Sequence, residues 1–365
     1  FEVDATIKLA KTHKVKREVD SKTFTSKMIK DAKTSPDGKT IIFTSLGHIY
    51  KKSLPNGKPQ RITNLTDFES EPSFSSDGKT VVFVSLKDEN LGAVHKIDLN
   101  GSNHKQLTTE KGIYRMPAFD PKNQKIVYKK EGGNEDQGFD FSKNTGIYLM
   151  NVDGSMAKKI ADGGDFPMFN TKGDRIFVQT GGSFMGGLTK TLISFDLEGQ
   201  KKQSHFSSKL ANRLVPSPDN QWISFIHLHK LYVAPFVHNG STINLDTNSS
   251  SFKVESLSEN AGINLHWSNN SSQVHWTLGD EYFTKSIVDN TNNPFAKTNL
   301  VTNKEAGIAI GLEVSTDKPQ GRIAFTNARL ITMENDKVIE NGTIIVYQNK
   351  IEKIGNSSSV KIPSG

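Results

Sequence analysis

The sequence predicts an all-β fold, a six-bladed β-propeller followed by a few short strands of a second β-domain. Three observations lead to this prediction. A turn motif recurs six times over residues 31–303, β-branched and aromatic residues follow each copy, and this region shows no helical periodicity over ten residues. Four antiparallel strands in every ~45 residues is the pattern of a propeller blade.

The turn motif is clearest in Ser35-Pro-Asp-Gly-Lys39 and Ser76-Asp-Gly-Lys79. Its central residue supplies the left-handed backbone conformation that a tight reversal needs. The central positions are spaced by 40, 45, 50, 47 and 51 residues and are Gly38, Gly78, Asn123, Gly173, Asn220 and Ser271. Five residues after them stand Phe43, Phe83, Tyr128, Val178, Phe225 and Trp276. We expect this second set to pack in the core, each at the same place in its own hairpin.

Each copy continues beyond this hairpin. A third apolar pair follows, as in Ile49-Tyr50 and Val94-His95, and several copies end in a fourth short strand such as Gln60-Arg-Ile-Thr63. The turn, the strand Ile41-Ile-Phe43 and the closing Arg61-Ile-Thr63 resemble the repeat of TolB-type propellers. Blade boundaries are least defined in the fourth and sixth copies, whose turns are degraded.

The chain is accordingly divided into four parts. Residues 1–30 form a basic extension, with eight Lys or Arg against four Asp or Glu, which is expected either to add a ring-closing strand or to stay mobile. Residues 31–303 form the propeller, 304–321 a linker or outer strand, and 322–365 the start of another domain.

The sequence pattern changes at Arg322. The segments Arg322–Met333, Val338–Tyr347 and Gln348–Gly355, with expected turns at Asn341-Gly342 and Gln348-Asn349, closely resemble the start of the β-sandwich of metal-dependent amidohydrolases of the imidazolonepropionase-like group. The resemblance implies a downstream hydrolase barrel that holds a divalent metal, expected to be zinc. So few strands are too small to be stable alone. We therefore expect them to pack on the propeller, to pair with another polypeptide, or to continue beyond residue 365.

Composition excludes several classes of protein. The chain has 365 residues, no Cys and a formal net charge of +7. Without Cys there is no disulfide framework and no thiolate nucleophile, and no apolar run approaches the ~20 residues of a membrane helix. The basic residues of the N-terminal segment alternate with acidic ones and lack aromatic neighbours, so no nucleic-acid partner is expected. A start at Phe1 fits either a removed signal peptide or an internal boundary, and we expect a periplasmic or secreted protein.

Candidate site residues are few, and no catalytic or cofactor-binding residue is predicted within the chain. His227-Leu-His229 has the spacing of a metal pair, but a zinc site needs at least a third ligand, so we interpret both histidines as structural. Glu71, Arg115, Asp165 and Arg213 fall just ahead of the first strand in four successive blades. There they would surround one mouth of the central channel, either as ion pairs or as a polar binding site.

Two functions are consistent with these patterns. The leading hypothesis is the non-catalytic propeller region of a metal-dependent amidohydrolase that acts on C–N bonds of cyclic amides or peptide-like substrates. In it the propeller would gate or recruit substrate, or mediate assembly. The alternative is a TolB-type periplasmic scaffold that binds a protein or peptide at the propeller mouth and has no enzymatic activity.

Overall fold

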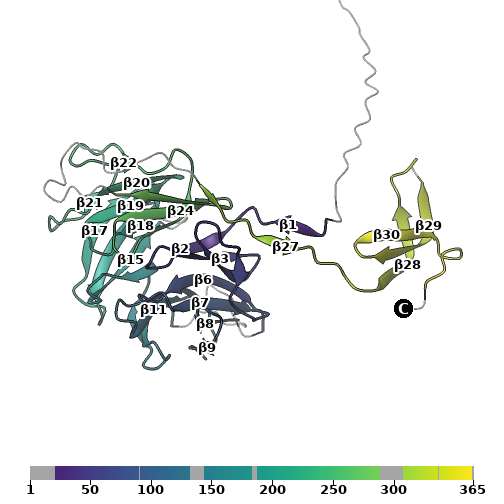
Figure 1. Cartoon of the computed structure of the whole chain (residues 1–365), viewed down its shortest axis with the longest axis horizontal. Coiled ribbons are helices and arrows are strands. Elements are labelled where there is room, and N and C mark those ends of the chain that lie inside the picture. The colour runs from purple at the N-terminus through teal and green to yellow at the C-terminus, as the bar shows by residue number, and fades with distance from the viewer. Residues whose placement is uncertain are drawn as a thin grey trace, which may run out of the picture. The chain divides into compact units, whose positions relative to one another are not determined.

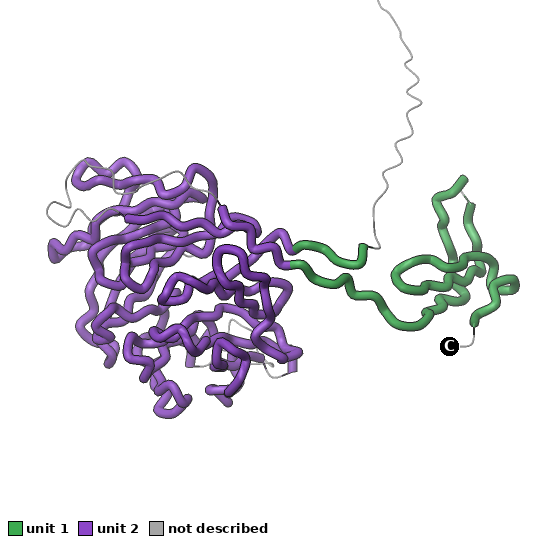
Figure 2. Tube along the Cα trace, in the orientation of Figure 1, with its two compact units in different colours: residues 1–25, 313–365 green, residues 26–312 purple. Residues whose placement is uncertain are grey.

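The structure is a computed structural model, and it describes residues 21–89, 91–131, 144–182, 187–287, 307–335 and 337–363. Every regular element in these ranges is a β-strand, so the all-β prediction is confirmed. Consistently, they hold no helix that is long and apolar enough to cross a membrane. The chain forms two compact units (Figure 2). One is Ser26–Leu312, and the other combines Phe1–Thr25 with Glu313–Gly365.

The larger unit consists, within the described residues, of six consecutive sheets whose strands follow one another along the chain (Figure 1). The first three sheets are β2 (Lys30–Thr34), β3 (Thr40–Ser45), β4 (His48–Ser53) and β5 (Gln60–Arg61); β6 (Phe68–Phe74), β7 (Thr80–Lys87), β8 (Leu91–Asp98) and β9 (Lys105–Gln106); and β10 (Tyr114–Phe119), β11 (Lys125–Lys130), β12 (Gly146–Asn151) and β13 (Lys158–Ala161).

The other three sheets are β14 (Asp165–Phe169), β15 (Arg175–Gly181), β16 (Lys190–Asp196) and β17 (Gln203–Ser208); β18 (Ala211–Pro216), β19 (Trp222–His227), β20 (Lys230–Pro235) and β22 (Glu255–Ser256); and β23 (Ile263–Trp267), β24 (Gln273–Leu278), β25 (Glu281–Ser286) and β26 (Ile308–Ala309). Neighbouring strands pair antiparallel, except that β21 (Ile243–Asn244) joins the fourth sheet parallel to β17.

The predicted turns join the first two strands of each sheet. All six central positions have positive φ, between 56° and 73°. In the first turn the Ser35 hydroxyl donates to Asp37 Oδ1 at 2.5 Å and accepts from the Thr40 amide at 2.9 Å. The Ser75 turn repeats this pattern with Asp77 and Thr80. The repeat identified in the sequence is therefore a structural repeat.

Aromatic side chains stack across the second and third strands at the repeated position. Phe43 faces Tyr50, with ring centroids 5.8 Å apart. Equivalent stacks pair Phe83 with His95, Tyr128 with Tyr148, Phe225 with Tyr232 and Trp276 with Phe283. In the fourth sheet Val178 faces Ile193 instead. Such cross-strand pairs stabilise a sheet locally.

Buried apolar side chains fill the space between neighbouring sheets. One cluster, for example, joins Ile42 and Ile49 of the first sheet to Val81 and Phe83 of the second. Four further clusters connect the second sheet to the third, and so on to the sixth. Each sheet is therefore stabilised through its faces rather than its edges, as in stacked repeat architectures.

The first and sixth sheets also meet. The Thr34 amide in β2 donates to His266 Nε2 in β23 at 3.0 Å. Lys52 in β4, whose side chain is buried, donates to the carbonyl oxygens of Ala309 and Ile310 at 2.5 and 3.0 Å. These contacts link the start of the unit to its end across more than 230 residues of sequence.

Within its described residues, the smaller unit contains two sheets. β1 (Thr23–Thr25) pairs with β27 (Glu313–Ser315), so this part of the N-terminal segment is not a strand of the six sheets. A second sheet comprises β28 (Arg322–Ile331), β29 (Val338–Tyr347) and β30 (Lys350–Asn356). The predicted turn at Gln348-Asn349 is confirmed, since both residues have positive φ.

The predicted turn at Asn341-Gly342 is wrong. Both residues lie inside β29, where Gly342 pairs with Ala328 at an irregularity of register. A side chain on Gly342 would collide with Leu330, so the glycine permits close packing rather than a reversal.

One face of this three-stranded sheet is apolar and open to solvent. Phe325 pairs with Ile344, which pairs with Ile354, and Ile323 pairs with Val346, which pairs with Ile351. Partners directly opposite each other share a face. Phe325 and Ile351 remain 55% and 62% exposed. We call this surface the open apolar face; it comprises Ile323, Phe325, Ile344, Val346, Ile351 and Ile354.

Candidate functional site

The four predicted rim residues lie inside the first strands of their sheets, in β6, β10, β14 and β18, and not in loops ahead of them. The first strands begin earlier than the sequence predicts because each is interrupted by a β-bulge, which breaks the alternation of side chains. The pairing of first and second strands shifts register in all six sheets.

In five of the six sheets the bulge begins at one repeated position, seven residues before the centre of each turn. In the fifth sheet it lies one residue earlier, at Asn212. The six residues at the repeated position are Asp31, Glu71, Met116, Phe166, Arg213 and Asn264. All except Arg213 have positive φ, between 51° and 58°. A non-glycine residue in this conformation costs on the order of 1–3 kcal/mol and persists only where its surroundings hold it.

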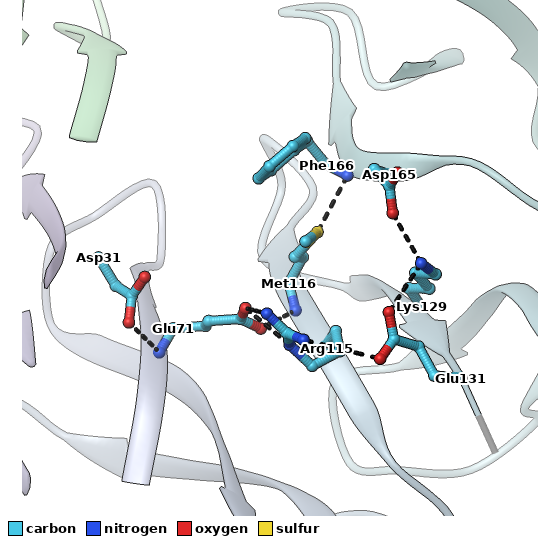
Figure 3. A network of polar contacts seen from close by, with 8 residues as sticks. All are labelled: Asp31, Glu71, Arg115, Met116, Lys129, Glu131, Asp165 and Phe166. Carbon is cyan, nitrogen blue, oxygen red and sulfur yellow. Dashed lines mark hydrogen bonds and ion pairs between the residues drawn. The ribbon is translucent and has the colours of Figure 1, made fainter. Parts of the chain in front are cut away.

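Side chains at this position hold the next strand's backbone. The Glu71 amide donates to Asp31 Oδ2 at 3.2 Å, and the Met116 amide donates to Glu71 Oε2 at 2.5 Å. The Phe166 amide then donates to the Met116 sulfur at 3.1 Å (Figure 3). Four successive sheets are thereby linked through equivalent bulges, and the first strands of consecutive sheets lie against one another.

Ion pairs extend this arrangement. Arg115 donates to Glu71 Oε1 at 2.6 and 2.8 Å and lies 3.6 Å from Glu131. Lys129 bridges Glu131 at 2.8 Å and Asp165 at 2.7 Å (Figure 3). We call the set in Figure 3 the first-strand network: Asp31, Glu71, Arg115, Met116, Lys129, Glu131, Asp165 and Phe166.

The network keeps its cations charged. The hydrogen bond to Glu71 raises the pKa of Arg115 against the opposing effect of desolvation. Desolvation lowers the pKa of Lys129, but its bonds to Asp165 and Glu131 more than offset this, so the net shift is upward. Charge-assisted hydrogen bonds of this kind are about twice as strong as neutral ones.

The structure brings three of the four predicted rim residues into one network and leaves the fourth beside it. Glu71, Arg115 and Asp165 are connected through Lys129 and Glu131. The guanidinium carbon of Arg213 instead lies 3.6 Å from the centre of the Phe166 ring. The other network members were not predicted from the sequence. The spacing of seven residues before each turn would have identified Asp31, Met116 and Phe166.

The two histidines considered as metal ligands do not lie on one face of a strand. His227 ends β19, and His229 follows in the two-residue turn before β20, after Leu228 with φ of 55°. Across the described ranges no group of three or more His, Asp or Glu side chains is placed to hold a metal ion. The structural role of His227 and His229 stays a prediction.

Comparisons with known proteins give three kinds of similarity. A family model described as the TolB beta propeller domain matches residues 23–233. The Tol-Pal system protein TolB of Francisella tularensis subsp. mediasiatica is 30% identical over 89 residues, which cover 24% of this chain and 19% of that protein. The chain thus matches only about a fifth of the length of such curated relatives.

Solved structures are similar at low identity. TolB from Acinetobacter baumannii gives a TM-score of 0.49 at 16% identity, covering 76% of this chain and 65% of that one. An oligogalacturonate lyase from Vibrio parahaemolyticus gives 0.49 at 12% identity, covering 71% and 77%. The family model covers more than half of this chain, spanning the first four repeated sheets and ending within β20 of the fifth. The chain therefore belongs to the TolB β-propeller family.

Proposed function

We propose that this chain is a protein-binding propeller whose six sheets are six blades, and that a peptide segment of its partner binds along the first-strand network. The observation that carries the proposal is the repeated bulge, with positive φ at five of six equivalent positions. Bulges redirect side chains and are over-represented beside functional sites. Residues in such costly conformations tend to cluster where ligands bind.

The network also has suitable chemistry for a peptide. It presents carboxylates, a guanidinium, an ammonium group and an aromatic ring on the first strands of four successive sheets and on or beside β11. Arg115 and Asp165 side chains keep 39% and 41% of their surface accessible, so both can exchange an internal partner for an external one. The Arg115 guanidinium can donate hydrogen bonds to peptide carbonyl oxygens, and the Asp165 carboxylate can accept them from peptide N–H groups. The family resemblance and the absence of Cys support a periplasmic or secreted location.

The test is capture from a cell-envelope fraction by the immobilised full chain. Arg115→Ala opens the network at its centre and should abolish retention of specific partners. The matched control is Lys158→Ala, which removes an exposed ion pair with Glu198 on an outer strand. Retention that is equal for wild type, Arg115→Ala and the control would show that partners bind elsewhere.

A second candidate, the front end of a metal-dependent amidohydrolase, is favoured by the open apolar face. A sheet face with six apolar side chains, four of them exposed and two half-buried, calls for a covering layer, as the start of a β-sandwich would. The described residues do not fit a metal, since none of them form a ligand group. In this candidate zinc and the hydrolytic centre would belong to a barrel outside residues 1–365, a partner of the propeller within one protein.

Activity separates the two candidates. The chain supplied with Zn²⁺ should not hydrolyse cyclic amides or dipeptides, whichever candidate holds. If the natural gene encodes a His-x-His strand soon after Ile362-Pro-Ser-Gly365, its full product should hydrolyse them. A full product without hydrolase activity that still captures partners supports the scaffold, and metal-dependent turnover by residues 1–365 alone would overturn both.

A further inference from the structure

Exposed apolar side chains gather at one end of the six sheets. In its described part, the unit Ser26–Leu312 has ten large apolar residues that are exposed. Nine of them lie at the end where first strands begin and second strands turn into third strands, and Met156 lies at the opposite end. Six of the nine stand ten residues before or eight residues after a turn centre. They form three pairs, which we call the apolar arc: Met28 with Leu46, Phe68 with Leu86, and Leu210 with Leu228.

The members of a pair lie next to each other. In the fifth sheet, the Leu228 amide donates to the Leu210 carbonyl oxygen at 3.1 Å. In the first sheet, the hydroxyl of Ser45, which precedes Leu46, donates to the Met28 carbonyl oxygen at 3.2 Å. The two side chains of a pair therefore start from adjacent stretches of backbone.

Neighbouring sheets bring the pairs together. The Phe68 ring packs on the turn of the first sheet, where a Cβ on Gly47 would lie 2.9 Å from it, and Phe68 is the direct strand partner of Leu86. Between the fifth and first sheets, the sixth presents its own exposed Ile263 and Leu278. Two hydrogen bonds make these junctions, from the Gly262 amide to the His229 carbonyl oxygen at 3.0 Å and from the Ile29 amide to the Gly279 carbonyl oxygen at 3.1 Å. The arc is therefore continuous over four neighbouring sheets.

Two residues of the arc occupy backbone conformations that leucine rarely adopts. Leu46 and Leu228 each begin a two-residue turn, with φ of 51° and 55°. The corresponding turn of the sixth sheet has Gly279 at φ of 63° instead. Glycine and asparagine adopt this conformation easily, whereas a bulky side chain is an outlier there. Because both leucines are also more than half exposed, neither turn formation nor core packing explains them.

The arc adjoins the first-strand network along the strands themselves. Met28, Phe68 and Leu210 each stand three residues before the repeated position that Asp31 occupies in the first sheet. Ile263 stands directly before it in the sixth sheet. The cations of the network belong to the third sheet, which carries no member of the arc. This end of the unit therefore combines an apolar part with a charged part.

The size and charge of the arc suit a segment of a protein. With the two residues of the sixth sheet, it presents apolar surface on the order of 500 Å², against about 800 Å² that each partner contributes to a standard interface. The charged residues beside it have both signs, such as Lys27 next to Met28 and Asp67 next to Phe68. A membrane-binding surface is typically lined by clustered Lys and Arg, so a protein segment fits better than a lipid surface.

We propose that the apolar arc binds large aliphatic or aromatic side chains of the same partner segment whose polar groups contact the first-strand network. This inference rests on the proposed function, because it names the apolar part of the segment that the propeller binds. The segment would place its polar groups toward Arg115 and Asp165. Its apolar side chains would pack on Leu46 and Leu228 at the tips of their turns, and on the residues paired with them.

The test is selection of phage-displayed random twelve-residue peptides on the immobilised full chain. We expect the selected peptides to share large apolar residues, and one of them is then titrated as a synthetic peptide. Leu46→Asn and Leu228→Asn should each weaken its binding about tenfold or more, since each removes a central apolar contact. Met156→Asn is the matched control and should change binding less than about twofold, because Met156 also has positive φ and is exposed but lies at the opposite end.

Folding does not confound the result, because asparagine adopts positive φ more readily than leucine. The melting temperatures of Leu46→Asn and Leu228→Asn should therefore equal or exceed that of the wild type. Failure to select any peptide, selected peptides without shared apolar residues, or binding unchanged in both variants would overturn the proposal.

Two further outcomes would assign the arc to another occupant and would also overturn the proposal. One is a wild-type dimer in sedimentation velocity that becomes monomeric in Leu46→Asn, which would indicate a second copy of the chain. The other is binding to phosphatidylglycerol vesicles that Leu46→Asn abolishes, which would indicate a lipid surface. If envelope partners are still captured through Arg115 in any of these cases, the scaffold function stands and only the apolar contact fails.

Discussion

Histidines buried between the strands make the propeller sensitive to acid at the scale of single residues. His95 Nε2 shares a hydrogen bond of 2.8 Å with the Ser85 hydroxyl, and the His95 ring stacks on Phe83. His275 Nδ1 shares a hydrogen bond of 2.8 Å with the Tyr282 hydroxyl. Desolvation lowers the pKa of each ring from 6.5 to about 4, and in His95 the neighbouring His104 contributes. Both rings are therefore neutral in the folded protein at physiological pH.

The sign of the pH effect follows from these shifts. Because the unfolded chain binds protons more tightly, the stability from the neutral rings is fully present above pH 6.5 and is lost between pH 6.5 and about 4. At pH 5 the loss should be on the order of 2 kcal/mol for each ring. The free energy of unfolding in urea at pH 7.5, 6 and 5 measures this loss of stability. His95→Gln should flatten the decline, and an identical decline in this variant would contradict the assignment.

At the scale of elements, the first and sixth sheets are joined by hydrogen bonds between residues far apart in the sequence. Lys52 donates to two carbonyl oxygens at β26, and burial lowers the pKa of its ammonium group. Lys52→Met keeps the stem but leaves both carbonyls without this donor. We expect a loss of about 2 kcal/mol in the free energy of unfolding. The control Lys39→Met alters an exposed turn residue and should cost almost nothing. Equal stability of both variants would mean that this contact does not stabilise the fold.

Much of this element structure could be predicted from the sequence. The turn at Gly38 and the core position of Phe43 follow from local chemistry, because a positive φ and a cross-strand aromatic pair leave a pattern in neighbouring residues. The network could not be predicted in the same way. Its contacts, such as Lys129 with Asp165, join strands of different sheets, and the bulges shift register by amounts that alternation does not reveal. The turn predicted at Asn341-Gly342 was wrong for a similar reason, because Gly342 allows close packing against Leu330 and does not reverse the chain.

At the scale of the whole molecule, the open apolar face should bind a hydrophobic dye. Phe325→Lys combined with Ile351→Lys places charges on two side chains that are more than half exposed. The fluorescence of added anilinonaphthalene sulfonate should drop several-fold, because this dye reports exposed apolar surface. Met156→Lys is the control, since Met156 is 79% exposed but isolated on a turn of the third sheet. Dye binding that responds equally to both changes would argue that the face is covered.

The central claim is that partners contact the propeller along its first strands, and site-specific photo-crosslinking tests it most directly. The full chain would carry p-benzoylphenylalanine in place of Phe166, which keeps an aromatic ring beside Arg213, or in place of Met156 on the outer turn. After irradiation in an envelope fraction, we predict a discrete crosslinked partner from position 166 and none from position 156. Crosslinks from position 156 alone, or none from position 166 while partners are captured, would contradict the account.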